Sequence, residues 1–141
     1  MGNCDSCFAG VSASAGAKAP VDPAACQKLI DAAKGGDSAG VKALLGSQGV
    51  DVNFKNEAFF DYTALHLAAG QGHTEVVTLL LQNGATVDPR STTDETPLIM
   101  AARAKKKPVV DVLLAWDADT SAKTNYKPPM AKSAQQYIDE M

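Results

Sequence analysis

Pairs of apolar residues recur in the second half of the chain at the spacing of an amphipathic helix. Val76–Val77 and Leu80–Leu81 place apolar side chains on one helical face. The same pattern returns 33 residues later, as Val109–Val110 and Leu113–Leu114. We expect each set to form a helix that buries this face against neighbouring elements.

A second phrase repeats at the same distance and predicts a shorter helix before each of these. Thr63–Ala69 has the sequence T-A-L-H-L-A-A, and Thr96–Ala102 has the sequence T-P-L-I-M-A-A, again 33 residues on. The paired alanines are small, so neighbouring helices can approach closely. Weaker copies occur at 29–37 and 127–130. A fixed period of this length indicates a repeat protein, in which stacked units complete one another's core.

These motifs resemble the ankyrin repeat, a unit of about 33 residues in which T-P-L-H-x-A opens the first of two helices. The resemblance implies an all-α fold, an ankyrin repeat solenoid of stacked helix–turn–helix units with β-hairpin-like tips. The degenerate first and last copies are suited to cap the stack. The expected units are a flexible N-terminal tail at 1–22 and a repeat domain at 23–141, with repeats at about 26–53, 61–93 and 94–126 and a partial C-terminal cap at 127–141.

Residues with special backbone preferences mark the predicted helix ends. Asp22 as N-cap and Pro23 at the first helical position begin the first helix. Gly72 ends the first helix of the middle repeat, where the backbone needs a positive φ. The third repeat has Lys105 at the equivalent place, which predicts a looser turn because lysine tolerates the left-handed region poorly.

Composition narrows the classes of partner. A formal net charge of −3 over 141 residues gives no general attraction to nucleic acid. No apolar run approaches the roughly 18 residues of a transmembrane helix. The cysteines at positions 4, 7 and 26 are too few and too clustered for a disulfide framework, and they favour a reducing, cytoplasmic setting. We expect the free chain to be monomeric.

The N-terminus matches the pattern for N-myristoylation, with Gly2 exposed after removal of Met1 and serine at position 6. Cys4 and Cys7 are placed for palmitoylation, which would supply the second signal that stable membrane attachment requires. These residues predict a peripheral protein on the cytoplasmic face of a membrane. The alternatives are an ordinary chain start, or a C-x-x-C metal or redox pair, for which the sequence supplies no partner pair.

Catalytic residues are not predicted. The two histidines, His66 and His73, have no cysteine, serine or aspartate at catalytic or metal-ligand spacing. The family resemblance implies that both make structural hydrogen bonds. Gly70–Gly72 follows a helix instead of opening one, so it fails the context test for a phosphate-binding loop. We therefore expect a protein that is not an enzyme and has no cofactor or metal.

The resemblance implies that partners bind to the tips and to the first helix of each repeat. The first tip is two residues longer than the second, because ten steps separate Asn53 from Thr63 and eight separate Asp88 from Thr96. The extra length carries aromatic residues, which are typical anchors of protein interfaces. The expected tips lie at 54–61, 89–95 and 123–127.

Phe59 and Phe60 are the predicted anchors, followed by Tyr62. One ring of the phenylalanine pair is expected to pack beneath the loop, and the other to be exposed and used. The predicted flanking contacts are Arg90, Asp94, Glu95 and Tyr126.

A basic cluster follows the first helix of the third repeat. The plain interpretation is a solvated turn between helices. The functional one is attraction to anionic lipid headgroups, which would act together with an acylated N-terminus. The cluster comprises Arg103, Lys105, Lys106 and Lys107.

Together these features predict an adaptor that recognises a protein partner through its tips and is tethered to a membrane by its N-terminus. Two alternatives remain open. One is a soluble regulatory or inhibitory subunit that masks the surface of a partner enzyme. The other is a stand-alone enzyme.

Overall fold

The computed structural model describes residues 21–125 and 132–140 of the 141-residue chain. The predicted lipidation residues Gly2, Cys4 and Cys7 and the predicted contact Tyr126 lie outside the described residues. The elements in chain order are α2 (Pro23–Gly35), α3 (Ser38–Leu45), η2 (Glu57–Phe59), α4 (Ala64–Gln71), α5 (Thr74–Gln82), α6 (Pro97–Arg103), α7 (Lys107–Ala115) and α8 (Ala134–Asp139).

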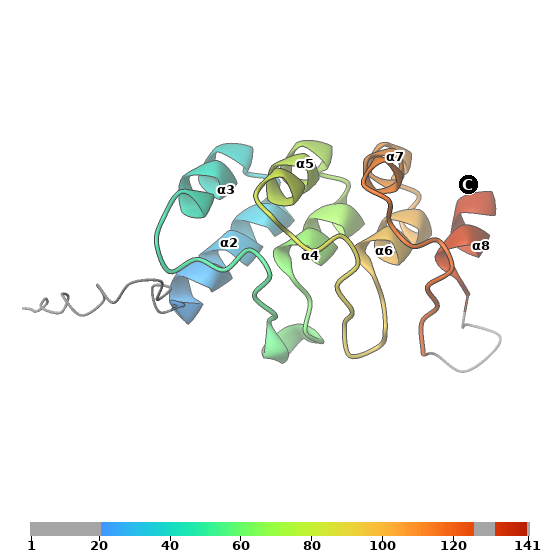
Figure 1. The fold of residues 1–141 in the computed structure, drawn as a ribbon, viewed down its shortest axis with the longest axis horizontal. Helices are drawn as coiled ribbons and strands as arrows, with labels where there is room; N and C mark the ends of the chain where they lie inside the picture. The colour runs from blue at the N-terminus through green and yellow to red at the C-terminus, as the bar shows by residue number, and fades with distance from the viewer. Residues whose placement is uncertain (1–20, 126–131, 141) are drawn as a thin grey trace, which may run out of the picture.

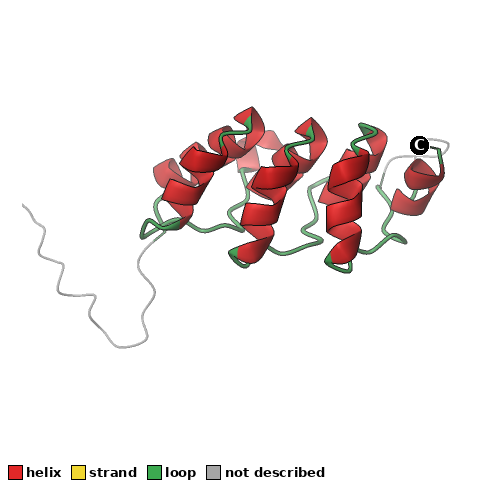
Figure 2. Cartoon of the chain, turned by 90° about the horizontal axis from the view of Figure 1, so that it is seen from above, coloured by secondary structure: helices red, strands yellow, loops and turns green. Residues whose placement is uncertain are grey.

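The helices form two rows along one axis (Figure 1). The inner row is α2, α4, α6 and α8, and the outer row above it is α3, α5 and α7. Each inner helix packs on the next inner helix, and each outer helix on the next outer helix. Seen from above, the helix pairs lie side by side in one row along the long axis of the molecule (Figure 2). This confirms the predicted all-α solenoid, in which each unit contacts mainly its neighbours.

The tips project below the inner row (Figure 1). Their hairpin character is slight, because the described residues contain no strand and only the isolated antiparallel bridges Asn56↔Tyr62 and Lys123↔Ser133. The extra residues of the first tip form the short 3₁₀ helix η2. The tips are therefore compact loops stabilised by local hydrogen bonds.

The repeated phrase begins an inner helix in each case, as predicted, and its threonine is the N-cap. Thr63 Oγ1 accepts a hydrogen bond from the His66 backbone N–H at 3.4 Å, while His66 Nδ1 accepts from Thr63 N–H at 3.1 Å, closing a capping box. Thr96 caps α6 in the same position, with Pro97 as its first residue. Asp22 caps α2 and Pro23 follows, as predicted.

The inner helices α2, α4 and α6 are each followed by a residue with left-handed backbone. Gly36, at the end of α2, has φ 77°, and a Cβ added there would lie 2.6 Å from the His73 ring. Gly72 has φ 86° as predicted, and Lys105, its counterpart in the third repeat, has φ 60°. Lysine is strained in this region, whereas glycine is not. The turn after α6 in the third repeat is therefore less favourable than the turn after α4 in the second.

The core lies between the two rows of helices. Paired alanines of α4 and α6 are buried, which confirms that they allow close approach of neighbouring helices. The apolar faces of α5 and α7 supply valines and leucines to the same core. Within the described residues, no helix combines the length and the apolar character needed to span a membrane.

Candidate partner-binding surface

The first tip is a loop closed by its own backbone. Asn56 N–H donates to the Tyr62 carbonyl at 3.1 Å, and the N–H groups of Phe59 and Asp61 donate to the Asn56 carbonyl at 2.9 and 3.0 Å. The Asn56 side chain caps η2 by accepting from Ala58 N–H at 3.0 Å. These bonds fix the two residues at the apex, Phe59 and Phe60.

Both phenylalanines are exposed. Phe59 retains 57% and Phe60 58% of its accessible surface, so the prediction that one ring packs beneath the loop is wrong. Phe59 ends η2 at the apex of the loop, and Phe60 and Asp61 after it both have positive φ, 54° and 59°. The Phe60 ring makes a tilted contact with Tyr62 at 5.8 Å between centroids.

Non-glycine residues in the left-handed region each cost about 1–2 kcal/mol, and two in succession require firm support from the surroundings. That support includes the second tip, where Thr92 N–H donates to the Phe60 carbonyl at 3.0 Å. Lys55 Nζ likewise donates to the Arg90 carbonyl at 3.1 Å. Beyond them, Asn125 N–H donates to the Thr93 carbonyl at 3.0 Å. The tips are thus bonded to one another in sequence order.

Glu95 was predicted as a partner contact, and this prediction is wrong, because its side chain is fully buried. Its Oε2 accepts from Tyr62 Oη at 2.7 Å and from Thr93 Oγ1 at 3.0 Å, and its Oε1 forms an ion pair with Arg103 Nη1. A carboxylate can be buried when donors of this kind replace water. Glu95 therefore links the first tip, the second tip and the end of α6.

The other predicted tip residues have different surroundings. Tyr62 is half-buried, and its hydroxyl is directed into the stack towards Glu95. Arg90 is exposed beside the first tip, to which its carbonyl is bonded. Asp94 is half-buried and has φ 58°, the left-handed conformation that aspartate tolerates better than most residues. The predicted tip contacts that the structure leaves exposed are thus the phenylalanine pair and Arg90.

His66 is part of the support beneath these tips. Its Nδ1 accepts from Thr63 N–H, so the remaining proton lies on Nε2, which donates to the Glu95 carbonyl at 2.9 Å. Burial lowers the pKa of His66 from 6.5 to about 4, and the hydrogen bond to Glu95 opposes this only in part. The imidazole is therefore neutral at pH 7 and connects one repeat to the next.

His73 makes the corresponding connection on the other side of the middle repeat, with Nε2 3.0 Å from the Lys34 carbonyl. The implied structural role of both histidines is confirmed by these bonds. In the part of the chain that the structure describes, no cluster of three or more histidine, cysteine, aspartate or glutamate side chains could hold a metal ion.

The predicted basic cluster does not form one patch. Arg103 is bound to Glu95. Lys106 lies along Gly72, close enough that a Cβ added there would be 2.8 Å from the lysine Cδ. Lys105 and Lys107 are exposed at the turn before α7. Two of the four cations are therefore engaged in packing the stack.

Sequence reasoning gave no role to Leu114, which is 37% exposed near the end of α7. Trp116, two residues further on, is 42% exposed. The available signal was the repeat itself: at the equivalent position of the middle repeat α7 packs beside the outer helix α5, whereas no outer helix follows α7 in the described part of the chain.

Comparison with known proteins gives matches over the same residues. The family model described as "Ankyrin repeats (3 copies)" matches residues 29–124. Serine/threonine-protein kinase 12 from Arabidopsis thaliana is 41% identical over 86 residues, which cover 61% of this chain and 18% of that protein. Ankyrin repeat domain-containing protein 40 from Mus musculus is 37% identical over 86 residues, which cover 61% of this chain and 23% of that protein.

A third relative is E3 ubiquitin-protein ligase XBAT33 from Arabidopsis thaliana, 36% identical over 90 residues that cover 64% of this chain and 17% of the ligase. The chain thus spans less than a quarter of the length of these three relatives. The kinase and ligase activities in their names are those of the longer proteins.

Proposed function

This chain belongs to the ankyrin repeat family, a family of protein–protein interaction modules, and we propose that it binds a protein partner through its first tip. Phe59 and Phe60 are the anchors in this proposal. Arg90 beside them supplies a polar contact at the edge. The function is recognition without chemistry, carried out by an adaptor.

The observation that carries the proposal is the pair of adjacent phenylalanines, 57% and 58% exposed, on a loop fixed by hydrogen bonds. Interfaces concentrate their binding energy in a few aromatic or arginine side chains that enter pockets on the partner. A loop that is already ordered loses little conformational entropy on binding. The left-handed backbone at Phe60 and Asp61 supports the same interpretation, because such strain is often found at functional loops.

We further propose that the N-terminus tethers this module to the cytoplasmic face of a membrane through acylation of Gly2 and of Cys4 or Cys7. The support is the sequence pattern alone. Tethering would raise the local concentration of the module near a membrane-bound partner.

The tip is tested by proximity labelling in cells, with a biotin ligase fused to the C-terminus so that the N-terminus stays intact. Phe59→Ala/Phe60→Ala should lose the proteins that the wild type labels most strongly. Trp116→Ala, which removes an exposed aromatic side chain elsewhere, is the matched control and should keep them. Loss of the same proteins in both variants would show that any exposed aromatic side chain supports the labelling, and this would refute a specific role for the first tip.

The tether is tested separately by Gly2→Ala. In the wild type, an alkyne analogue of myristate should label the chain, and the protein should sediment with membranes. The variant should lose both. If it fractionates with membranes as the wild type does, the anchor is absent. If the wild type is soluble from the start, the alternative of a soluble regulatory subunit is favoured, and the role of the tip is unaffected.

A further inference from the structure

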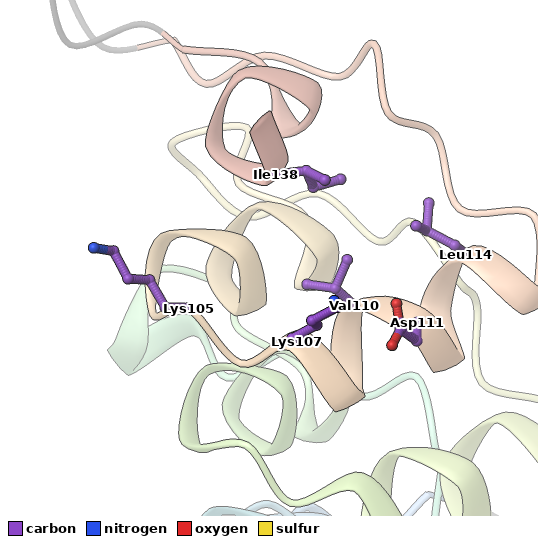
Figure 3. A pocket seen from close by; sticks show the side chains of 6 residues that line it. All are labelled: Lys105, Lys107, Val110, Asp111, Leu114 and Ile138. Atoms are coloured by element: carbon purple, nitrogen blue, oxygen red, sulfur yellow. The ribbon is translucent and has the colours of Figure 1, made fainter. Parts of the chain in front are cut away.

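The end of the stack formed by α7 and α8 has a groove that the first tip does not explain. It is an open cavity of about 350 Å³. Leu114 and Val110 from α7 face the same space as Ile138 from α8 (Figure 3). Lys107 and Asp111 lie along α7, and Lys105 extends away at the edge (Figure 3). We call this set of six residues the C-terminal groove.

The internal repeat shows how the equivalent surface is covered one unit earlier. Leu114 stands 33 residues after Leu81, at the same place in its outer helix. Leu81 is 3% exposed in α5, the helix beside which α7 packs, whereas Leu114 is 37% exposed. Among the described residues no outer helix follows α7. The apolar face of α7 is thus the kind of surface that an outer helix covers elsewhere in this stack.

The inner helix at this end differs in a matching way. Ala68 and Ala101 are the fifth residues after the N-caps Thr63 and Thr96, and both are fully buried beside the paired outer helix. The equivalent residue after Ser133 in α8 is Ile138, which is only half-buried. A large apolar side chain therefore lines the space where an alanine accommodates a close neighbour in the complete repeats.

Charge indicates the chemistry of an occupant for this face. Lys105 and Lys107 are exposed, and neither forms an ion pair with a described residue. They lie at the N-terminal end of α7, the positive end of its dipole, where no side chain caps the helix. Asp111 is the single acid in the groove lining. The excess positive charge favours an occupant with carboxylates.

We propose that the C-terminal groove binds an amphipathic α-helix of a protein partner, placed as α7 is placed beside α5. Leucine-type side chains of that helix cover Leu114 and Ile138. Its aspartates or glutamates face Lys105 and Lys107. This site is separate from the first tip and does not depend on it.

A second copy of the chain is a poorer occupant. The free end of the stack that could continue α7 is α3, whose exposed side carries Lys42 together with the alanines Ala39 and Ala43. That side offers little apolar area, and its lysine would approach two more lysines. Repulsion between like charges opposes this contact, most strongly at low ionic strength.

The probe is taken from the protein's own outer helix. A fluorescent peptide of residues 106–118 presents the face that α5 already accepts, and a hydrocarbon staple between positions 111 and 115, both exposed in α7, keeps it helical. The acidic form of the peptide carries Lys106→Glu and Lys107→Glu. The basic form keeps both lysines and is otherwise identical.

Fluorescence polarisation with the full chain should show the acidic peptide binding at least about tenfold more tightly than the basic peptide, with a difference that shrinks as salt is added. Methyl resonances of Leu114 and Ile138 should shift on titration, and those of Leu81 should not. Equal binding of the two peptides, no binding, or shifts at Leu81 from displacement of α7 would each overturn the proposal.

Two variants test the residues, and both keep the buried core intact. Leu114→Glu should weaken binding of the acidic peptide at least about tenfold, and Lys107→Glu should reduce or reverse the preference for it. Ala43→Glu on α3 is the matched control and should change nothing. Phe59→Ala/Phe60→Ala should bind the peptide normally, whatever happens at the tip. If the chain alone forms a dimer that Leu114→Glu abolishes, the occupant is a second copy and the proposal fails.

Discussion

Protonation of His66 is predicted to weaken the whole stack in mildly acidic solution. The imidazole is buried, accepts from Thr63 N–H and donates to the Glu95 carbonyl, an arrangement that suits the neutral ring. A proton added to Nδ1 would face a backbone N–H and remove the acceptor that the capping box requires. The charged ring would also lack solvation.

The size of the effect follows from the two pKa values. In the unfolded chain His66 takes up its proton near pH 6.5, whereas in the folded protein burial lowers its pKa to about 4. Between these values the unfolded state binds more protons, so stability falls as the pH falls. This contribution is fully present above pH 6.5 and is lost progressively down to pH 4. The loss is about 2 kcal/mol at pH 5 and about 3 kcal/mol in total.

The assay is urea unfolding followed by helical circular dichroism at several pH values between 7 and 4. His66→Gln is the reference, because its amide can still donate to the Glu95 carbonyl but does not titrate. The variant should have a lower free energy of unfolding than the wild type at pH 7. Between pH 7 and pH 4, however, the free energy of unfolding of the variant should fall by about 3 kcal/mol less than that of the wild type. Carboxylates that titrate in this window are common to both proteins and cancel in the difference.

Two results would refute this reasoning. Equal losses in the wild type and His66→Gln would show that the imidazole does not couple stability to pH. An NMR titration of the folded protein in which the His66 ring protonates near pH 6.5 would show that burial does not lower its pKa. His73, the other histidine, must be assigned separately in that titration.

Three further predictions concern the stability of the stack, each measured by urea unfolding at pH 7. Gly36→Ala should destabilise the folded protein by about 1–2 kcal/mol, because Gly36 has positive φ and its added Cβ would meet the His73 ring. Gly35→Ala, whose added Cβ has nothing within 4 Å, should stabilise the folded protein by about 0.5–1 kcal/mol. Equal effects of the two substitutions would contradict the role of the His73 contact. Tyr62→Phe should lose about 1–2 kcal/mol by removing a donor to buried Glu95, and an unchanged midpoint would show that this bond is unimportant. Lys105→Gly should stabilise by about 0.5–1 kcal/mol by relieving its left-handed backbone, and a loss would show that the lysine side chain matters more.

The stack could be predicted from the sequence because its determinants are local and repeated. Thr63 and Thr96 are N-caps in the structure because each side chain needs only the backbone three residues ahead. Gly72 shows the predicted left-handed backbone for the same kind of reason. Determinants within a few residues of one another survive in a sequence as a visible pattern.

The surface was harder to predict, because its residues depend on distant partners. Glu95 appears beside a tip as an ordinary exposed acid, and carboxylates are seldom fully buried. It is buried because Tyr62, 33 residues earlier, and Arg103, eight residues later, are brought to it by the stack. Both phenylalanines likewise belong to a loop with left-handed backbone at Phe60 and Asp61, which a hydrogen bond from Thr92 of the second tip supports.

The neighbour-to-neighbour packing of the helices has a consequence for the evolution of this chain. Because the extensive helix contacts join adjacent elements, a duplication of one 33-residue unit would lengthen the stack without disturbing the rest. The first tip and the C-terminal groove would then move apart by one unit. The distance between these two surfaces would therefore change only by whole repeats.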